Sequence, residues 1–296
     1  MSELVSVIIA TYRREAELTS ALKSLAGQTY KNFEIIVVDD NADATWNLKV
    51  KNAVEEFCKN NPSMCVNYIA NSSNQGSART RNIGIDGASG EYITFLDDDD
   101  IYLPSKIERQ LRFMKENLLD YCITDLYLYN ESDKLVDKRV RSYISDTSPE
   151  SLLREHLKHH ITGTDTLMFK RDYLMKIGKF PLIDMGDEFY LMMQAIDNRG
   201  KFGYLEGCDV KAYIHSENGG MSSRMGKITG ENELYEFKKK YFNRLKARDI
   251  RYVKARHYAV LAFAYLRSKK YGRFLANGCL AMLVSPINCL KILMAR

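Results

Sequence analysis

The fold is decided by residues 74–104, which read NQGSARTRNIGIDGASGEYITFLDDDDIYLP. Within them, Tyr92–Leu96 (YITFL) is a short apolar run typical of a strand that is buried on both faces. Four aspartates, Asp97–Asp100, follow this run directly, and Pro104 is well placed to open a helix. The pattern therefore predicts a buried strand, an acidic loop at its end, and a helix after the loop.

The segments on the N-terminal side of this stretch alternate between strand and helix patterns. Strands are predicted at Leu4–Ala10, Glu34–Val38 and Val66–Ala70. Between them, apolar residues recur at i, i+3, i+4 and i+7, once from Leu18 and again from Val50, which is one face of a helix. Strands that alternate with helices of this length predict an α/β fold with a mostly parallel sheet and right-handed crossovers.

In such a sheet, ligands bind beyond the carboxyl ends of the strands, so the residues that follow each strand form the candidate site. Four groups of polar residues stand there: Thr11-Tyr12-Arg13, Asp39-Asp40, the stretch from Asn74 to Asn82, and Asp97–Asp100. We expect all four groups to converge on one crevice.

The four consecutive aspartates indicate a bound cation. Like charges in a row after a buried strand repel one another, and a hard ion such as Mg²⁺ or Mn²⁺ relieves this repulsion while also bridging phosphates. Alternation predicts that Asp97 and Asp99 reach the ion or a nucleotide, while Asp98 and Asp100 make structural hydrogen bonds. The alternative is a solvated acidic turn or a helix N-cap, both of which favour Asp.

Two other residues have weaker signals when taken alone. Asp39, at the end of a strand, can accept hydrogen bonds from a base or a ribose, as in dinucleotide folds. The glycine-rich fingerprint of those folds is absent after the first strand, which argues against a nicotinamide enzyme. Arg81 can contact an anion or a base, although an arginine in a helical segment is more often a surface residue.

Three ordered motifs give the chain its resemblance to a known family. They are VSVIIATYRRE (5–15), FEIIVVDDNAD (33–43) and the stretch 74–104. Together they resemble the family 2 glycosyltransferases with the GT-A fold, whose usual sequences are S-V-I-I-P-x-Y-N, V-V-D-D-G-S-x-D, N-x-G-x-x-x-A-R-N-x-G and F-L-D-x-D-D-x-x-x-P. The resemblance covers about residues 3–225.

The resemblance implies a nucleotide-sugar site with a divalent ion, Mn²⁺ or Mg²⁺. Asp39 would hydrogen-bond the base, most often uracil, and the D-x-D element would hold the ribose and the diphosphate-bound ion. The nucleotide-binding candidates are Thr11, Tyr12, Arg13, Asp39, Asn74, Arg81, Asp97 and Asp98. The metal candidates are Asp97, Asp99 and His215. Departures from the family pattern stand at Ala10, Arg13 and Asn41-Ala42.

The family takes its catalytic base from an acidic pair before a later helix. Asp187-Glu188 occupies that place, and the resemblance favours Glu188 as the base while leaving Asp187 open. Without the resemblance, the pair reads as an ordinary acidic helix N-terminus. Arg224 and Lys227 lie in a glycine-flanked segment that would fold over the diphosphate.

The pattern changes after Tyr121. A strand is predicted at Tyr121–Tyr129, an irregular polar excursion at 130–160, and helices from Glu231 onward. Met221–Arg296 carries 17 Lys and Arg against 4 Asp and Glu, or +13, which leaves about −8 for the preceding residues. We therefore predict a GT-A catalytic domain at 1–225 and a basic helical region at 226–296.

The basic region has two interpretations that the sequence leaves open. It would lie on the inner face of the plasma membrane as a peripheral contact, or it would pack as a helical subdomain. No nucleic-acid-binding signature accompanies its charge. The six cysteines show neither a C-x-x-C pair nor zinc spacing, and no leader pattern begins the chain, so a cytoplasmic protein is expected.

The resemblance implies an inverting, metal-dependent glycosyltransferase. The donor would be a nucleotide sugar, with UDP favoured, and the acceptor a hydroxyl of a bacterial surface polysaccharide or of a lipid-linked glycan. Two alternatives remain at this point: a sugar-phosphate nucleotidyltransferase and a non-catalytic sugar-nucleotide-binding assembly partner. The acidic pair at Asp187-Glu188 argues against the second of them.

Overall fold

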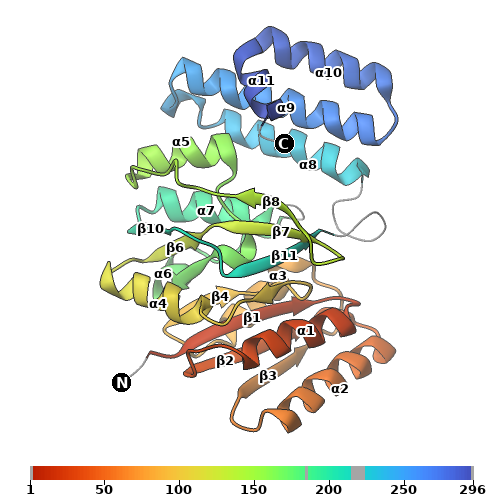
Figure 1. Cartoon of the computed structure of the whole chain (residues 1–296), viewed down its shortest axis with the longest axis vertical. Coiled ribbons are helices and arrows are strands. Elements are labelled where there is room, and N and C mark those ends of the chain that lie inside the picture. Colours follow the sequence, from red (N-terminus) through yellow and green to blue (C-terminus); the bar gives the residue numbers. More distant parts are fainter. Residues whose placement is uncertain (1–2, 184–185, 215–223, 295–296) are drawn as a thin grey trace. The chain divides into compact units, whose positions relative to one another are not determined.

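The computed structural model describes residues 3–183, 186–214 and 224–294. The chain divides into two compact units, shown in Figure 1. The sheet unit comprises Met1–Thr147 and Thr162–Ser216, and the helical unit comprises Ser148–Ile161 and Glu217–Arg296. No described helix is long and apolar enough to cross a membrane, and all six cysteines are free.

A seven-stranded sheet forms the centre of the sheet unit. Its strands are, in spatial order, β10 (Phe202–Leu205), β6 (Tyr121–Thr124), β9 (Met168–Lys170), β4 (Tyr92–Phe95), β1 (Val5–Thr11), β2 (Phe33–Asp39) and β3 (Cys65–Ala70). All neighbouring pairs are parallel except those of β9, which runs antiparallel to β4 and β6. The mostly parallel α/β sheet expected from the sequence is confirmed.

Helices cover both faces of this sheet. They are α1 (Glu15–Ala26), α2 (Ala44–Asn60), α3 (Ser77–Asp86), α4 (Lys106–Glu116), α6 (Arg171–Lys176) and α7 (Asp187–Asp197), with a 3₁₀ turn, η1 (Thr164–Thr166). Leu18 and Leu22 of α1 are fully buried in one core cluster with Val7. On the opposite face, a Cβ added at Gly84 of α3 would lie 2.5 Å from Cγ2 of Ile8. Alternate residues of β1 therefore contact different helices, as expected of a strand covered on both faces.

A second sheet of four strands lies beside the first. Its order is β5 (Ile101–Tyr102), β11 (Val210–Ile214), β7 (Leu126–Asn130) and β8 (Leu135–Arg139). The single strand predicted at Tyr121–Tyr129 was wrong, because β6 and β7 belong to different sheets and are separated by Asp125. The buried Asp125 carboxylate accepts hydrogen bonds from the Arg141 N–H, the Tyr204 hydroxyl and the Gly207 N–H, which fix the break.

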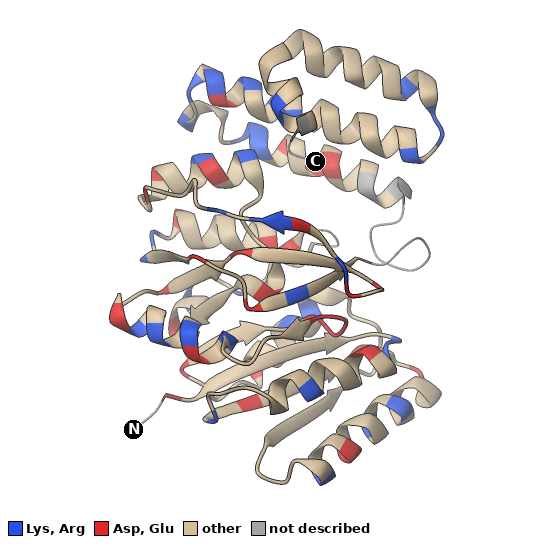
Figure 2. Ribbon diagram, viewed as in Figure 1, with Lys and Arg blue, Asp and Glu red and all other residues tan. Residues whose placement is uncertain are grey.

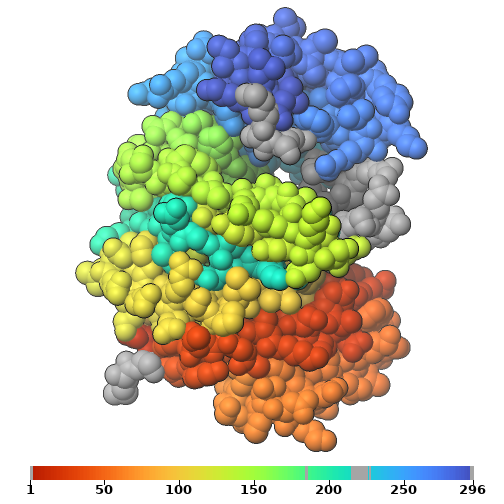
Figure 3. Space-filling view, viewed as in Figure 1, coloured from red at the N-terminus to blue at the C-terminus, as the bar shows by residue number. Residues whose placement is uncertain are grey.

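The helical unit is built around one long helix, α9 (Ala247–Arg267). The other helices are α5 (Pro149–His159), α8 (Arg224–Lys239), α10 (Tyr271–Val284) and α11 (Pro286–Met294), with a 3₁₀ turn, η2 (Phe242–Arg244). In the space-filling view the blue residues of α9 to α11 pack into one continuous mass (Figure 3). The polar stretch 130–160, predicted to be irregular, contains β8 and α5, and α5 opens with Pro149 at its first turn.

Candidate active site

The four polar groups that follow the strands meet at one edge of the large sheet, as expected. Thr11 at the end of β1 is paired with Asp39 at the end of β2. The Tyr12 N–H donates to Asp98 Oδ2 at 3.2 Å, and Asn74 Nδ2 donates to the Asp40 carbonyl oxygen at 3.0 Å. The candidate site is therefore assembled from the carboxyl ends of β1, β2 and β4 and the start of α3.

The aspartates after β4 do not act as one group. The buried Asp98 accepts from Arg14 Nη1 at 2.9 Å, and Asp99 Oδ2 lies 2.7 Å from the same nitrogen. Burial raises the pKa of Asp98 to about 6, although the charge of Arg14 opposes this rise. Arg14 was not predicted as a site residue, because nothing in the sequence indicates which side chain faces a loop 84 positions away.

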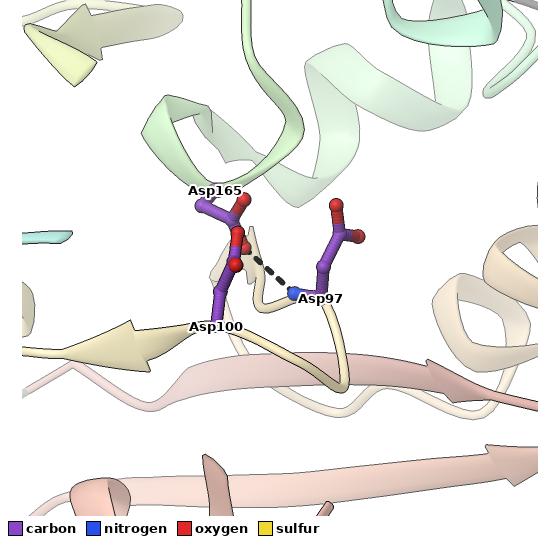
Figure 4. A group of neighbouring side chains, drawn as sticks. All are labelled: Asp97, Asp100 and Asp165. Carbon is purple, nitrogen blue, oxygen red and sulfur yellow. Dashed lines mark hydrogen bonds between the residues drawn. The ribbon is translucent and has the colours of Figure 1, made fainter. Parts of the chain in front are cut away.

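Asp97 and Asp100 instead form a cluster with Asp165, drawn in Figure 4. One carboxylate oxygen from each lies within 4.8 Å of the other two. Asp165 Oδ1 accepts from the Asp97 N–H at 2.6 Å, and Asp100 Oδ1 accepts from the Tyr213 N–H at 2.8 Å. Burial and neighbouring carboxylates raise the pKa of Asp165 to about 7 and that of Asp100 well above its ordinary range.

This cluster has the chemistry that a hard divalent ion requires. Three carboxylates supply oxygen ligands. Burial and the neighbouring carboxylates raise the pKa values of Asp100 and Asp165, and a cation at this place would relieve the crowded negative charge. Of the metal candidates from the sequence, Asp97 belongs to the cluster and Asp99 faces Arg14. His215 lies outside the described residues, as do the side chains of Arg224 and Lys227.

Arg81 of α3 links this cluster to the acidic pair. Its Nη2 donates to Asp97 Oδ1 at 2.6 Å and its Nη1 to Asp187 Oδ2 at 2.8 Å. The guanidinium lies 5.6 Å from the centre of the Phe180 ring, and the side chain is only 11% exposed. Burial lowers the pKa of Arg81, but the carboxylates outweigh this effect and raise it above its ordinary value. Arg81 is thus an interior bridge and not a surface helix residue.

The acidic pair forms the first turn of α7, after Gly186 in a left-handed conformation (φ 73°). Asp187 is buried; its Oδ2 accepts from Arg81 and from Ser77 Oγ, and its Oδ1 accepts from the Glu188 N–H at 2.9 Å. Burial first, and then the Asp187 carboxylate, raise the pKa of Glu188 to about 8. Glu188 therefore keeps a proton more readily than an ordinary glutamate.

The remaining nucleotide candidates surround Asp39, which is fully buried. Asp39 Oδ1 accepts from the N–H and the Nδ2 of Asn41, and Oδ2 accepts from the Tyr68 hydroxyl at 2.7 Å. Asn41 Oδ1 in turn accepts from the Arg13 N–H at 2.7 Å.

Arg13 holds a left-handed backbone conformation (φ 55°), and its guanidinium lies 5.2 Å from the ring of Tyr12. Tyr12 is 45% exposed, whereas Thr11 is buried. Asn41, a departure from the family pattern, therefore connects the loops after β1 and β2 through Arg13 and Asp39.

Comparisons with known proteins all identify glycosyltransferases. The sequence model of glycosyl transferase family 2 matches residues 6–178. An uncharacterized glycosyltransferase of Haemophilus influenzae is 33% identical over 178 residues, which are 59% of this chain and 55% of that protein. The Escherichia coli protein WfaP, named UDP-Glc:alpha-D-GlcNAc-diphosphoundecaprenol beta-1,3-glucosyltransferase, is 32% identical over 62% of this chain and 67% of its own length.

Two solved structures show the same fold. Staphylococcus aureus TarS 1-349, in complex with UDP-GlcNAc, superposes with a TM-score of 0.61 at 21% identity, covering 94% of this chain and 91% of that one. The Pyrobaculum calidifontis mannosyltransferase PcManGT, in complex with GDP-Man and Mn²⁺, gives 0.62 at 17% identity, covering 95% and 81%.

The chain spans about half the length of the Haemophilus relative (55%), so the match concerns a shared domain. The segment that the family model matches, residues 6–178, includes nearly all of β1 to β4, the aspartate loop, Arg81 and Asp165. With its GT-A fold and a family match over more than half of its length, the chain belongs to glycosyl transferase family 2.

Proposed function

We propose that this protein is a metal-dependent, inverting glycosyltransferase that moves a sugar from a nucleotide-sugar donor to an acceptor hydroxyl. One observation carries the proposal: Arg81 donates to Asp97 and to Asp187 at once. A single guanidinium therefore spans the carboxylates suited to the donor diphosphate and the pair suited to the acceptor hydroxyl. A transfer reaction needs these two groups side by side.

The donor that we favour is a UDP-sugar. WfaP is named for UDP-Glc, and TarS is solved with UDP-GlcNAc, whereas PcManGT is solved with GDP-Man. We infer that the base binds beside the buried Asp39, whose oxygens already accept from Asn41 and Tyr68 and so fix these two side chains around it. Tyr12 would cover the base, since its ring is exposed at the mouth of the site.

The metal that we favour is Mn²⁺ or Mg²⁺, held by Asp97, Asp100 and Asp165. When bound, such an ion supplies positive charge to the leaving nucleoside diphosphate. The guanidinium of Arg14 pairs with Asp98 and Asp99 and so holds the acidic loop against the segment that follows β1.

The base that we favour is Glu188, because the oxygens of Asp187 are already engaged. Asp187 holds Arg81, Ser77 and the first turn of α7, which suits a positioning role. Glu188, with its pKa raised to about 8, would accept the proton of the acceptor hydroxyl as that oxygen attacks the anomeric carbon. Direct displacement by this hydroxyl inverts the anomeric configuration.

The acceptor that we propose is a hydroxyl of a surface polysaccharide or of a lipid-linked glycan. WfaP is named for a diphosphoundecaprenol-linked acceptor, which is a lipid-linked sugar. We accordingly propose a cytoplasmic protein that works peripherally at the inner face of the plasma membrane.

The proposed donor site is tested by isothermal titration of UDP- and GDP-sugars, with Mn²⁺ and with chelator. We expect metal-dependent binding of one nucleotide class, weakened at least about tenfold by Asp100→Asn and less by Asp99→Asn. If metal-dependent binding were lost in Asp99→Asn and kept in Asp100→Asn, the result would support the metal ligands predicted from the sequence and contradict the cluster of Asp97, Asp100 and Asp165 as the metal site. Product analysis then shows whether the bound sugar is transferred. Binding without turnover would indicate a non-catalytic assembly partner.

A further inference from the structure

Helices α10 and α11 expose an unusual number of large apolar side chains. Among the residues that the structure describes, nine of the nineteen exposed large hydrophobics lie between Leu266 and Leu293. Eight of them belong to α10 and α11 and are called here the outer apolar face: Tyr271, Leu275, Leu280, Met282, Leu283, Ile287, Leu290 and Leu293. Exposed apolar residues gathered in this way mark interaction surfaces.

The spacing along α10 places most of these side chains on one side of the helix. Tyr271, Leu275 and Met282 are separated by four and seven residues, so they fall within one narrow stripe. Leu283, which is 80% exposed, lies about 100° farther round the helix, and Leu280 lies beyond it, so the exposed apolar side is broad. In the charge-coloured view, α10 is almost entirely tan (Figure 2).

Helix α10 is apolar on its inner side as well as on its outer side. Ala281 of α10 is buried in one cluster with Ala255 and Ala259 of α9, together with Cys289 of α11. A helix that is designed to meet water on its outer side turns its large apolar residues inward. Helix α10 packs Phe274 and Val284 inward and still carries leucine and methionine on its outer side, so the outer side is suited to an apolar environment.

The charges around the outer apolar face are of one sign. Residues 250–296 contain nine Lys and Arg and no Asp or Glu. Arg267, Lys269 and Lys270 lie at the turn between α9 and α10, visible as blue ribbon in Figure 2. Two copies meeting at this face would bring these like charges together, whereas an anionic surface would complement them.

A cationic hollow lies next to the outer apolar face, within the helical unit. It has a volume of about 620 Å³. Lysines and arginines outnumber carboxylates in its lining, which includes Arg154, Lys158, Arg248, Arg251 and Lys291 together with Glu155 and Asp249. Ile287 lines the hollow and also belongs to the outer apolar face. Burial, and after it the charge of Lys158, lower the pKa of His159 in the wall to about 4, which agrees with a positive potential there.

We propose that the outer apolar face docks on an anionic phospholipid bilayer, with α10 and α11 in the interfacial layer and the cationic hollow holding a lipid phosphate. Apolar side chains bordered by lysine and arginine are the combination that interfacial helices use. That this docking brings a lipid-linked acceptor to the enzyme rests on the proposed function, but the docking itself does not.

The test is sedimentation of the full chain with lipid vesicles. We expect binding to vesicles of equal parts phosphatidylglycerol and phosphatidylcholine, and little binding to phosphatidylcholine alone. The variant Leu283→Gln/Ile287→Gln should lose roughly tenfold in affinity per residue, since each substitution removes an exposed apolar side chain that the bilayer would bury. Arg251→Gln/Lys291→Gln should lose about fivefold per charge, and only with the anionic vesicles.

The matched control is Leu48→Gln/Leu118→Gln, which removes two leucines of the sheet unit that are 59% and 71% exposed and should bind vesicles like the wild type. Circular dichroism verifies that each variant is folded. The proposal is overturned if the wild type does not bind anionic vesicles, or if Leu283→Gln/Ile287→Gln binds them unchanged. It is also overturned if that variant only converts a dimer into a monomer, because the face would then join two copies.

Titration of the same variants with UDP-sugar separates the two proposals. Vesicle binding without donor binding would contradict the proposed function and still support the docking surface. Donor binding and turnover without vesicle binding would overturn the docking surface and the peripheral location, and would leave the proposed transfer reaction intact.

Discussion

A single guanidinium, that of Arg81, holds two parts of the site that are far apart in sequence. Asp97 follows β4, whereas Asp187 begins α7, and Arg81 pairs with both at less than 3 Å. The planar fork of arginine makes this double contact possible, and a lysine offers only a point charge in its place.

We therefore expect Arg81→Lys to reduce kcat/KM by at least about a hundredfold while the protein stays folded. Steady-state kinetics with the UDP-sugar found by titration measure the loss. The control is Arg79→Lys, two positions earlier, where an exposed arginine donates to Gln75 and activity should be unchanged. Equal activity of Arg81→Lys and wild type would contradict the bridge.

The proposed base predicts a pH dependence with a definite sign. Glu188 must be ionised to accept a proton, so the rate should rise with pH and level off above about 8, where its raised pKa lies. Glu188→Gln should remove this dependence and lower kcat by about 10²–10⁴-fold. A rate that is flat between about pH 6 and 9 would assign the base to another residue.

The same pKa shift has a consequence for stability. Because the folded protein holds the Glu188 proton more tightly than the unfolded chain, this residue costs stability as pH rises from 4.5 through about 8. Glu188→Gln should therefore melt at a higher temperature than wild type at pH 8, and the difference should vanish near pH 4. Thermal unfolding at both pH values tests this.

Residues that follow parallel strands were predictable, whereas their partners were not. Asp39, Asp97 and Arg81 stand where the sequence places them, since strand ends can be read from local patterns. Asp165 was missed because it precedes its strand. As β9 is antiparallel, its beginning and not its end meets the carboxyl edge of β4.

At the scale of elements, α3 packs closely against β1. Gly84 allows this approach, since a Cβ there would lie 2.5 Å from Ile8. Gly84→Ala should lower the free energy of unfolding by about 1–3 kcal/mol in urea titrations, through overpacking. Gly87→Ala, where the nearest atom would be 3.4 Å away, is the control and should change stability by less than about 1 kcal/mol.

Element prediction succeeded where periodicity is strong and failed at a change of sheet. The buried β-branched run of β1 and the apolar stripe of α1 were read correctly from spacing alone. Nothing local marks Asp125 as the point where the chain passes from one sheet to the other. Its three hydrogen-bond donors come from 16 to 82 positions away.

At the scale of the whole molecule, ligand binding should protect only one part of the chain. UDP with Mn²⁺ binds the sheet unit in the proposed function, and at a hundredfold excess over Kd it adds about 2.7 kcal/mol of stability. Hydrogen exchange should slow at residues 11–14, 74–81 and 97–100, while residues 247–294 keep their rates. Uniform slowing over both groups would contradict a donor site confined to the sheet unit.

The division of charge between the two ends of the chain was readable from composition, but the membership of the helical unit was not. Helix α5 packs on α9 although nearly ninety positions separate them. The sequence of α5 predicts that it is a helix, but it does not indicate which element it packs against. Contacts between distant segments are the part of a fold that local patterns do not encode.

That membership of α5 affects how such proteins can be reshaped. The chain crosses between the units at residues 147–148, 161–162 and 216–217, so three covalent links join them. A gene truncated after residue 216 would still encode α5 without the helix on which it packs. The C-terminal helices are therefore not a cassette that recombination can exchange in a single event: replacing them requires a matching change in the middle of the gene.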